Sequence, residues 1–231
     1  MVFEVHKKDR RGQADFCWLQ ANYSFSFANH YDPERMGFGD LLVLNDDVIA
    51  ANKGFPTHPH QDMEIISIPL KGCLAHKDST GAEDNTCQGE IQVMSAGTGM
   101  MHSEYNPSTT QETHSLQLWV KPRTRGVSPR YQKISYELVD NALTKVVSGE
   151  QEEGCAFIYQ DANLYLGLLE KNKRLTHDVV SGFGVYLFVI KGRVEVLGET
   201  LSSKDAIAIR EEDALTLHAL DDATFLLIET K

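Results

Sequence analysis

The sequence predicts an all-β protein, built as a sandwich or a barrel, and three observations lead to that fold class. Short segments in which apolar and polar residues alternate dominate the 231 residues, and this period of two is typical of strands. Glycines at positions 54, 72, 81, 89, 97 and 99 mark turns about one strand apart. Helical periodicity is weak throughout, so packed sheets are the expected architecture.

The expected strands are of two kinds. In residues 23–28, Phe25 and Phe27 share one face and serines share the other. The other segments are mainly apolar and have the length of a strand that is buried in a sheet. In chain order the expected strands are 23–28 (YSFSFA), 65–71 (IISIPLK), 90–94 (EIQVM), 115–120 (SLQLWV), 185–190 (VYLFVI), 205–209 (DAIAI) and 225–230 (FLLIET).

The chain resembles itself at an interval of about 120 residues. Residues 68–78 (IPLKGCLAHKD) match 188–198 (FVIKGRVEVLG) in their apolar residues, their Lys-Gly pair and the alternation that follows. Beyond each copy, an acidic residue opens another alternating strand, at Glu90 and Asp205. Two copies of one β module are the simplest explanation. We therefore expect an N-terminal domain over residues 1–130 and a C-terminal domain over 145–231, joined within 121–150.

Composition limits the classes of function. The net charge of -11 disfavours direct contact with nucleic acid or anionic lipid, which require clustered Lys and Arg. The first residues contain no apolar run of signal-peptide length, and no stretch approaches a membrane span, so a cytoplasmic location is expected. The four cysteines form no C-x-x-C pair, which predicts reduced and mostly packed thiols.

Histidines form the pattern with most chemical content. His58 and His60 are two residues apart, the spacing that puts two side chains on one face of a strand. His102 and Glu104 repeat that spacing after another glycine turn. Pro59 lies between the first two histidines, and a strand that contains proline must be an edge strand or locally distorted. Two antiparallel strands of this kind could bring four ligands to one point inside a barrel.

Such a group suits a transition metal better than calcium or magnesium. Three imidazoles and a carboxylate match Fe, Zn, Ni, Mn or Cu, and they leave coordination positions open for a substrate. Spacing alone leaves two alternatives open. Glu64 has the parity to be the carboxylate ligand instead of Glu104, and the histidines could also be hydrogen-bonded surface residues with no metal. The other histidines, His6, His30, His76, His114, His177 and His218, are expected at ordinary polar positions.

Two motifs resemble those of the cupin superfamily. Gly54–Gly72 reads G-x3-H-x-H-x3-E-x7-G, and Gly99–Asn106 reads G-x2-H-x3-N. More narrowly, FPTHPHQDMEI, SAGTGMMHSEYNP and LQLWV closely resemble the pirin family, and the bacterial pirin-like proteins in particular. WLQANYSFSFANHYDP near the start is similar to the same group. The resemblance covers about residues 1–125, whereas the second module is similar only to a degenerate cupin.

The resemblance implies a bicupin of two jelly-roll-like β-barrels, with one divalent metal ion in the first. It implies His58, His60, His102 and Glu104 as ligands, and it moves Glu64 to a position from which its carboxylate would orient a ligating imidazole. Fe(II) is the first choice of metal, with Cu, Ni, Mn, Co and Zn as alternatives. The second copy lacks both ligand pairs, because Asp178 and Val180 fall at the positions of His58 and His60.

The resemblance also implies a function. Bacterial pirin-like proteins resemble quercetin 2,3-dioxygenases, which open the heterocycle of a flavonol with O2 and release carbon monoxide. Glu104 is the first candidate for accepting the substrate proton, and Glu64 is the second. An apolar pocket lined by residues such as Phe55, Met63, Met94, Met101 and Trp119 would hold the substrate. The alternative is a metal-containing regulator that binds a protein partner and responds to redox state or stress; the oligomeric state is left open.

Overall fold

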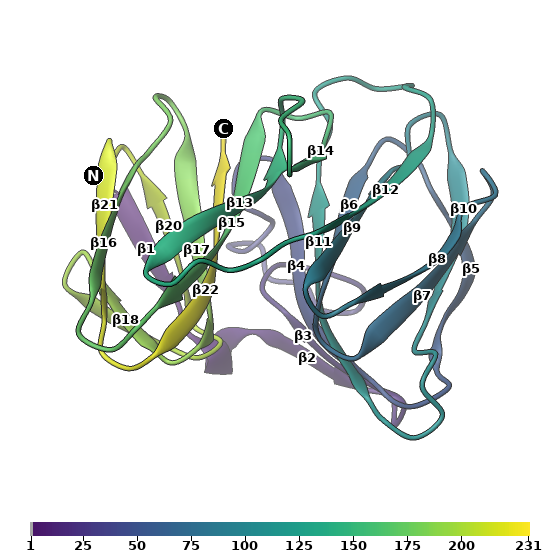
Figure 1. Cartoon of the computed structure of the whole chain (residues 1–231), viewed down its shortest axis with the longest axis horizontal. Helices are drawn as coiled ribbons and strands as arrows, with labels where there is room; N and C mark the ends of the chain where they lie inside the picture. The colour runs from purple at the N-terminus through teal and green to yellow at the C-terminus, as the bar shows by residue number, and fades with distance from the viewer. Residues whose placement is uncertain (1) are drawn as a thin grey trace. The chain divides into compact units, whose positions relative to one another are not determined.

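The protein, described by a computed structural model over residues 2–231, forms two compact units. The N-terminal unit comprises Gly12–Tyr136 and Gly149–Gln160, and the C-terminal unit comprises the segment that ends at Arg11 together with Glu137–Ser148 and Asp161–Lys231. Both consist almost entirely of antiparallel strands (Figure 1). The all-β prediction is therefore confirmed. The domain limits 1–130 and 145–231 remain a prediction, although β1 (Val2–His6) pairs with a strand of the C-terminal unit.

The N-terminal unit is built from two sheets. The larger runs in the order β12-β9-β6-β11-β4-β3-β2 and the smaller in the order β5-β10-β7-β8. Both orders are open, so the unit is a jelly roll of facing sheets and not a closed ring of hydrogen-bonded strands. The strands of these two sheets are β2 (Gly12–Asp15), β3 (Leu19–Tyr23), β4 (Leu41–Ile49), β5 (Gly54–His60), β6 (Glu64–Lys71), β7 (Cys73–Asp78), β8 (Glu83–Cys87), β9 (Glu90–Ser95), β10 (Met100–Tyr105), β11 (Thr113–Val120) and β12 (Arg130–Ser135). The short strand β14 (Ala156–Phe157) also falls in this unit but belongs to neither sheet.

The C-terminal unit repeats this topology. The strands of its sheets run in the order β1-β20-β17-β22-β15-β13 and β16-β21-β18-β19. The neighbouring strands β9, β6, β11 and β4 of the N-terminal unit thus correspond, in the same order, to β20, β17, β22 and β15. The internal duplication expected from the sequence is visible in this correspondence. The remaining elements are the short helix η1 (Lys8–Arg10), β13 (Ala142–Ser148), β15 (Ala162–Leu169), β16 (Arg174–Asp178), β17 (Gly184–Lys191), β18 (Arg193–Val196), β19 (Glu199–Ser202), β20 (Ala206–Arg210), β21 (Ala214–Ala219) and β22 (Ala223–Thr230).

The interiors of the two units differ. Strands of both C-terminal sheets contribute to one continuous apolar cluster, which includes Leu187, Leu215, Leu217 and Phe225. In the N-terminal unit, the buried apolar residues include a cluster around Ile49 and another around Met94. The strand β4 carries three buried polar residues in succession at positions 45–47. These polar side chains lie on a strand that also lines the cavity described below.

Two sequence expectations are wrong. Residues 23–28 were expected to form a strand, but β3 ends at Tyr23. The following segment turns because the Ser26 hydroxyl binds the backbone of Asp32 at 2.8 Å in both directions. The cysteines were expected to be reduced, but Cys73 and Cys87 form a disulfide. These two residues face each other directly across the β7–β8 pair, a pairing that local spacing could not indicate.

Within residues 2–231, no helix is both long enough and apolar enough to cross a membrane.

Candidate metal centre

The strands β5 and β10 form the frame of the candidate site. They pair antiparallel, with His58 opposite His102. β5 is the edge strand of its sheet, which is where Pro59 can be accommodated without loss of a ladder hydrogen bond. At Gly54, an added Cβ atom would lie 2.2 Å from the backbone oxygen of Glu104. The glycine therefore permits the close approach of β5 to β10.

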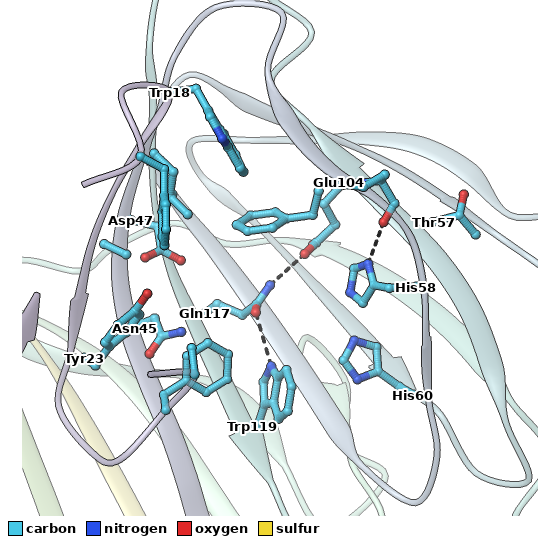
Figure 2. A pocket seen from close by; sticks show the side chains of 17 residues that line it. Trp18, Tyr23, Asn45, Asp47, Thr57, His58, His60, Glu104, Gln117 and Trp119 are labelled. Atoms are coloured by element: carbon cyan, nitrogen blue, oxygen red, sulfur yellow. Dashed lines mark hydrogen bonds between the residues drawn. The ribbon is translucent and has the colours of Figure 1, made fainter. Parts of the chain in front are cut away.

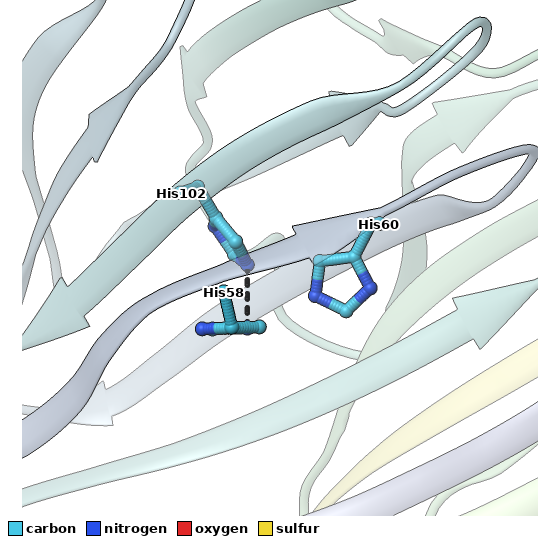
Figure 3. A group of neighbouring side chains, drawn as sticks. All are labelled: His58, His60 and His102. Carbon is cyan, nitrogen blue, oxygen red and sulfur yellow. Dashed lines mark hydrogen bonds between the residues drawn. The ribbon is translucent and has the colours of Figure 1, made fainter.

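Three histidines converge from these strands (Figure 3). Ligand atoms of His58, His60 and His102 all lie within 4.8 Å of one another. The ring centroids are 4.5 Å apart for His58 and His102, 4.8 Å for His58 and His60, and 4.9 Å for His60 and His102. The Nε2 atoms of His58 and His102 face each other at 3.0 Å. The predicted histidine cluster is therefore brought together by the fold.

The chemistry of the three imidazoles fits a divalent transition metal. His58 donates its Nδ1 proton to the backbone oxygen of Pro56 at 2.7 Å, so its Nε2 lone pair faces the other rings. Burial, together with the neighbouring His58, lowers the pKa of His60 to about 4 and that of His102 to about 3. These two rings are thus neutral near pH 7 and can offer lone pairs to a metal. Without one, His102 Nε2 donates its proton to His58 Nε2 at 3.0 Å, and a cation among the rings would replace that proton.

Glu104 is held firmly beside this cluster. Its side chain points inward from β10 and is only 2% exposed. Ser67 Oγ and Gln92 Nε2 donate to Glu104 Oε1 at 3.0 and 2.6 Å, and Gln117 Nε2 donates to Oε2 at 2.6 Å. Gln117 is oriented in turn by the Trp119 indole N–H at 3.1 Å (Figure 2). Such outer hydrogen bonds orient a carboxylate that functions at a metal site.

Glu64, which the resemblance implies as a support of the site, lies on the face of β6 that is turned away from Glu104. On β6, Glu64 and Ser67 have opposite parity, and Ser67 is the residue that reaches Glu104. The carboxylate of Glu64, fully buried, accepts a hydrogen bond from Ser95 Oγ at 2.7 Å. Burial raises its pKa, although the bond from Ser95 acts in the opposite direction. None of its assigned partners is a site histidine, so Glu64 has no role in the mechanism below.

His76 was assigned to an ordinary polar position, but it lies against the site. It is 1% exposed, and its ligand atoms group with those of His102 and Glu104. His76 Nε2 donates to Asp78 Oδ2 at 2.9 Å, and its ring stacks on Tyr131 at 4.4 Å. The sequence contained one signal: Leu74, His76 and Asp78 alternate along β7 and share its buried face.

A cavity of about 480 Å³ opens onto the cluster, within the range that accommodates small organic ligands. His58, His60 and Glu104 line one part of it (Figure 2). Of the five pocket residues expected, Phe55 and Trp119 line the cavity. Met63 and Met94 instead pack in an apolar cluster, and Met101 is 41% exposed.

The positions of the C-terminal unit that are equivalent to the three histidines carry no group of metal-binding side chains. Inward-facing residues of β21 are Leu215 and Leu217, both buried in the apolar cluster. His218 has the opposite parity and is half-buried. His177 Nε2 donates to the buried Glu229 at 3.0 Å. Over residues 2–231, the groups of three or more residues that could hold a metal both lie in the N-terminal unit.

The lowered pKa values of His60 and His102 predict that the metal-free protein loses stability in acid. Between about pH 4 and pH 6.5, His60 and His102 bind protons in the unfolded chain but not in the folded chain. The free energy of unfolding should therefore fall as the pH drops through this window. Thermal unfolding of the chelator-treated protein measures it. The variant His60→Gln/His102→Gln should have a shallower pH dependence, by about two protons per chain at pH 5, and an unchanged slope would contradict the assignment.

Comparison with protein families identifies both parts of the chain. A family model described as Pirin matches residues 4–120. A second, described as Quercetinase C-terminal cupin domain, matches residues 145–230.

Curated relatives and solved structures agree with these matches. A quercetin 2,3-dioxygenase of Escherichia coli K12 is 42% identical over 225 residues, covering 97% of both chains. A putative quercetin 2,3-dioxygenase of Pseudomonas aeruginosa is 40% identical and covers 99% of both. The crystal structure of YhhW from Escherichia coli superposes with a TM-score of 0.96 at 41% identity, covering 100% of this chain and 98% of that one. A structure of the bacterial pirin YhhW in complex with nickel(II) gives 0.95 at 40% identity, covering 99% of both.

Proposed function

The chain belongs to the pirin family, and on that premise we propose that it is a metal-dependent dioxygenase that opens the heterocycle of quercetin-like flavonols. The observation that carries the proposal is the cluster of three histidines beside a cavity that several aromatic side chains line. Full-length relatives named as quercetin 2,3-dioxygenases support it. The regulatory alternative is not favoured, because these relatives are named for an enzymatic activity.

We propose that His58, His60, His102 and Glu104 hold one divalent metal ion, with Fe(II) as the resident metal. The three imidazoles and the carboxylate have the donor chemistry of such a site, and a related structure contains nickel(II). When bound, the ion would lower the pKa of a coordinated substrate hydroxyl and leave a position open for it.

The chain's own residues would bind the substrate and accept its proton. Phe55 and Trp119 line the cavity next to the histidines and would contact a flat flavonol and exclude water from it. Glu104 Oε2 would accept the proton of the 3-hydroxyl, since its carboxylate lines the same cavity. Gln117 fixes the orientation of this oxygen through its 2.6 Å hydrogen bond. Ring opening would then consume O2 and release carbon monoxide.

The proposed activity can be tested on the purified chain. Separate samples are loaded with Fe(II), Cu(II), Ni(II) or Mn(II) and supplied with quercetin in air. We expect O2 uptake and carbon monoxide release in equal amounts with at least one metal. Absence of turnover with every metal would rule out the dioxygenase proposal.

A further prediction concerns the number of metal ions. His218→Ala should leave the stoichiometry at one ion per chain, because the inward positions of the C-terminal unit carry leucines. Elemental analysis of the dialysed protein measures this ratio. A decrease would show that the C-terminal unit also binds metal.

A further inference from the structure

His76 and His102 each keep one buried ring nitrogen without a hydrogen bond. Both residues are 1% exposed, and over residues 2–231 the Nδ1 atoms of the two rings have no hydrogen-bond partner. A buried polar atom without a partner costs free energy, so its presence in a folded protein requires an explanation. The two rings are neighbours, with centroids 5.4 Å apart, and a single explanation covers both.

Strand register places the two rings on one inner surface of the smaller sheet. β7 pairs antiparallel with β10, so that His76 lies opposite Glu104 and Asp78 lies opposite His102. A ring nitrogen of His76, a ring nitrogen of His102 and a carboxylate oxygen of Glu104 all lie within 4.8 Å of one another. His76 is therefore next to two of the proposed metal ligands, although it is not one of them.

The hydrogen bonds of Asp78 determine where the proton of His76 lies. Asp78 Oδ1 accepts from the backbone N–H and the hydroxyl of Thr80, at 2.8 and 2.6 Å. Its Oδ2 accepts from His76 Nε2 at 2.9 Å. Because a carboxylate can only accept, the neutral His76 ring carries its proton on Nε2 and keeps a lone pair on Nδ1. His76 thus offers a buried acceptor next to His102.

His102 needs an acceptor of this kind when its Nε2 holds a metal ion. In the metal-free chain that nitrogen donates to His58 Nε2 at 3.0 Å. A ligating nitrogen carries no proton, so the neutral ring then has its proton on Nδ1. Glu104 is already occupied, since three side chains donate to its two oxygens. Of the two groups clustered with His102, His76 is the one with a free acceptor.

We propose that His76 is a positioning residue of the metal site: in the metal-bound chain it accepts a hydrogen bond at Nδ1 from His102 Nδ1, and Asp78 fixes the direction of that bond. This inference rests on the proposed function, since it takes His102 as a metal ligand. A ligating histidine almost always donates its other N–H to an outer partner, which fixes the ring and raises metal affinity. Here that partner is a second histidine, and it contacts neither the ion nor the substrate.

Nuclear magnetic resonance of the Zn(II)-loaded chain tests the hydrogen bond itself, because Zn(II) is diamagnetic. In isotope-labelled wild-type protein we expect His102 to carry its proton on Nδ1 and this proton to exchange slowly with water. A scalar coupling across the hydrogen bond should connect the Nδ1 nuclei of His102 and His76. Absence of this coupling in the metal-loaded chain would overturn the inference.

Zn(II) affinity, measured by competition with a chelating dye, tests the consequence. His76→Leu removes the acceptor and should weaken Zn(II) binding by about 10- to 100-fold. His76→Asn has nearly the shape of that variant but keeps an oxygen near the position of Nδ1, and it should recover most of the loss. Asp78→Asn should also weaken binding, because an amide donor facing His76 Nε2 would move the ring proton onto Nδ1.

His177→Leu is the matched control. His177 Nε2 also donates to a buried carboxylate, that of Glu229, at 3.0 Å, but it lies in the C-terminal unit. Its replacement should leave the Zn(II) affinity at the wild-type value. Circular dichroism should show that all four variants keep their strand content.

The outcomes separate this inference from the dioxygenase proposal. Wild-type affinity in His76→Leu would overturn the inference. Equal weakening in His76→Leu and His76→Asn would also overturn it, because packing of the ring and not its acceptor would then be responsible. Weakening that His76→Asn restores, in a chain that does not turn over quercetin in air, would support the inference and contradict the dioxygenase proposal. If the wild-type chain binds no Zn(II), the proposed metal site and this inference both fail.

Discussion

Replacing His102 by alanine should abolish metal binding and, with it, flavonol turnover. His102 lies at the centre of the cluster, with its Nε2 3.0 Å from that of His58 and its ring 4.9 Å from that of His60. It is 1% exposed, so water cannot readily replace the missing ligand. We expect metal affinity to fall by more than about 100-fold, since removing even an outer partner of a ligand costs 10- to 100-fold. Competition with a chelating dye measures it.

His218→Ala is the matched control for this substitution. It removes one imidazole from a strand equivalent to β10, but His218 faces away from the interior of its unit. Circular dichroism should show that both variants keep their strand content. Retention of metal by His102→Ala at wild-type affinity would mean that the three histidines are not the metal site.

Glu104→Gln should lower turnover by about 100-fold or more, the range expected when a proton acceptor is removed. The substitution also replaces one of the two acceptor oxygens by an amide nitrogen, which would confront the amide donor of either Gln92 or Gln117. Metal content of the purified variant separates loss of a ligand from loss of a proton acceptor. The measurement is O2 uptake with quercetin at saturating metal.

Glu64→Gln is the comparison for this prediction, because it makes the same chemical change at another buried carboxylate. Glu64 accepts a hydrogen bond from Ser95 and from none of the site histidines. Turnover should stay close to that of the wild-type chain. If Glu64→Gln is the more damaging variant, then the assignment of the carboxylate is wrong.

Much of the fold could be predicted from the sequence because period-two alternation depends on local geometry. Buried runs such as 115–120 and 185–190 lie within β11 and β17, and the repeated Lys-Gly turn reflects the shared topology of the two units. The prediction failed at 23–28, where alternation was present but Ser26 stabilises a turn through the backbone of Asp32. It also missed the disulfide, since pairing of Cys73 with Cys87 depends on strand register.

The sequence by itself determined which residues could meet at the site. The spacing of two between His58 and His60, and between His102 and Glu104, places each pair on one face of a strand whatever the rest of the fold does. Tertiary structure alone decided which faces point at one another. Glu64 has the same sequence parity as His58 and His60, which allowed it as a metal ligand. In the structure it begins the next strand, β6, and the pairing of β6 with β9 places it opposite Ser95. The same assembly of strands brought in His76. Contacts between strands distant in sequence depend on register and on sheet packing, and no local pattern encodes either.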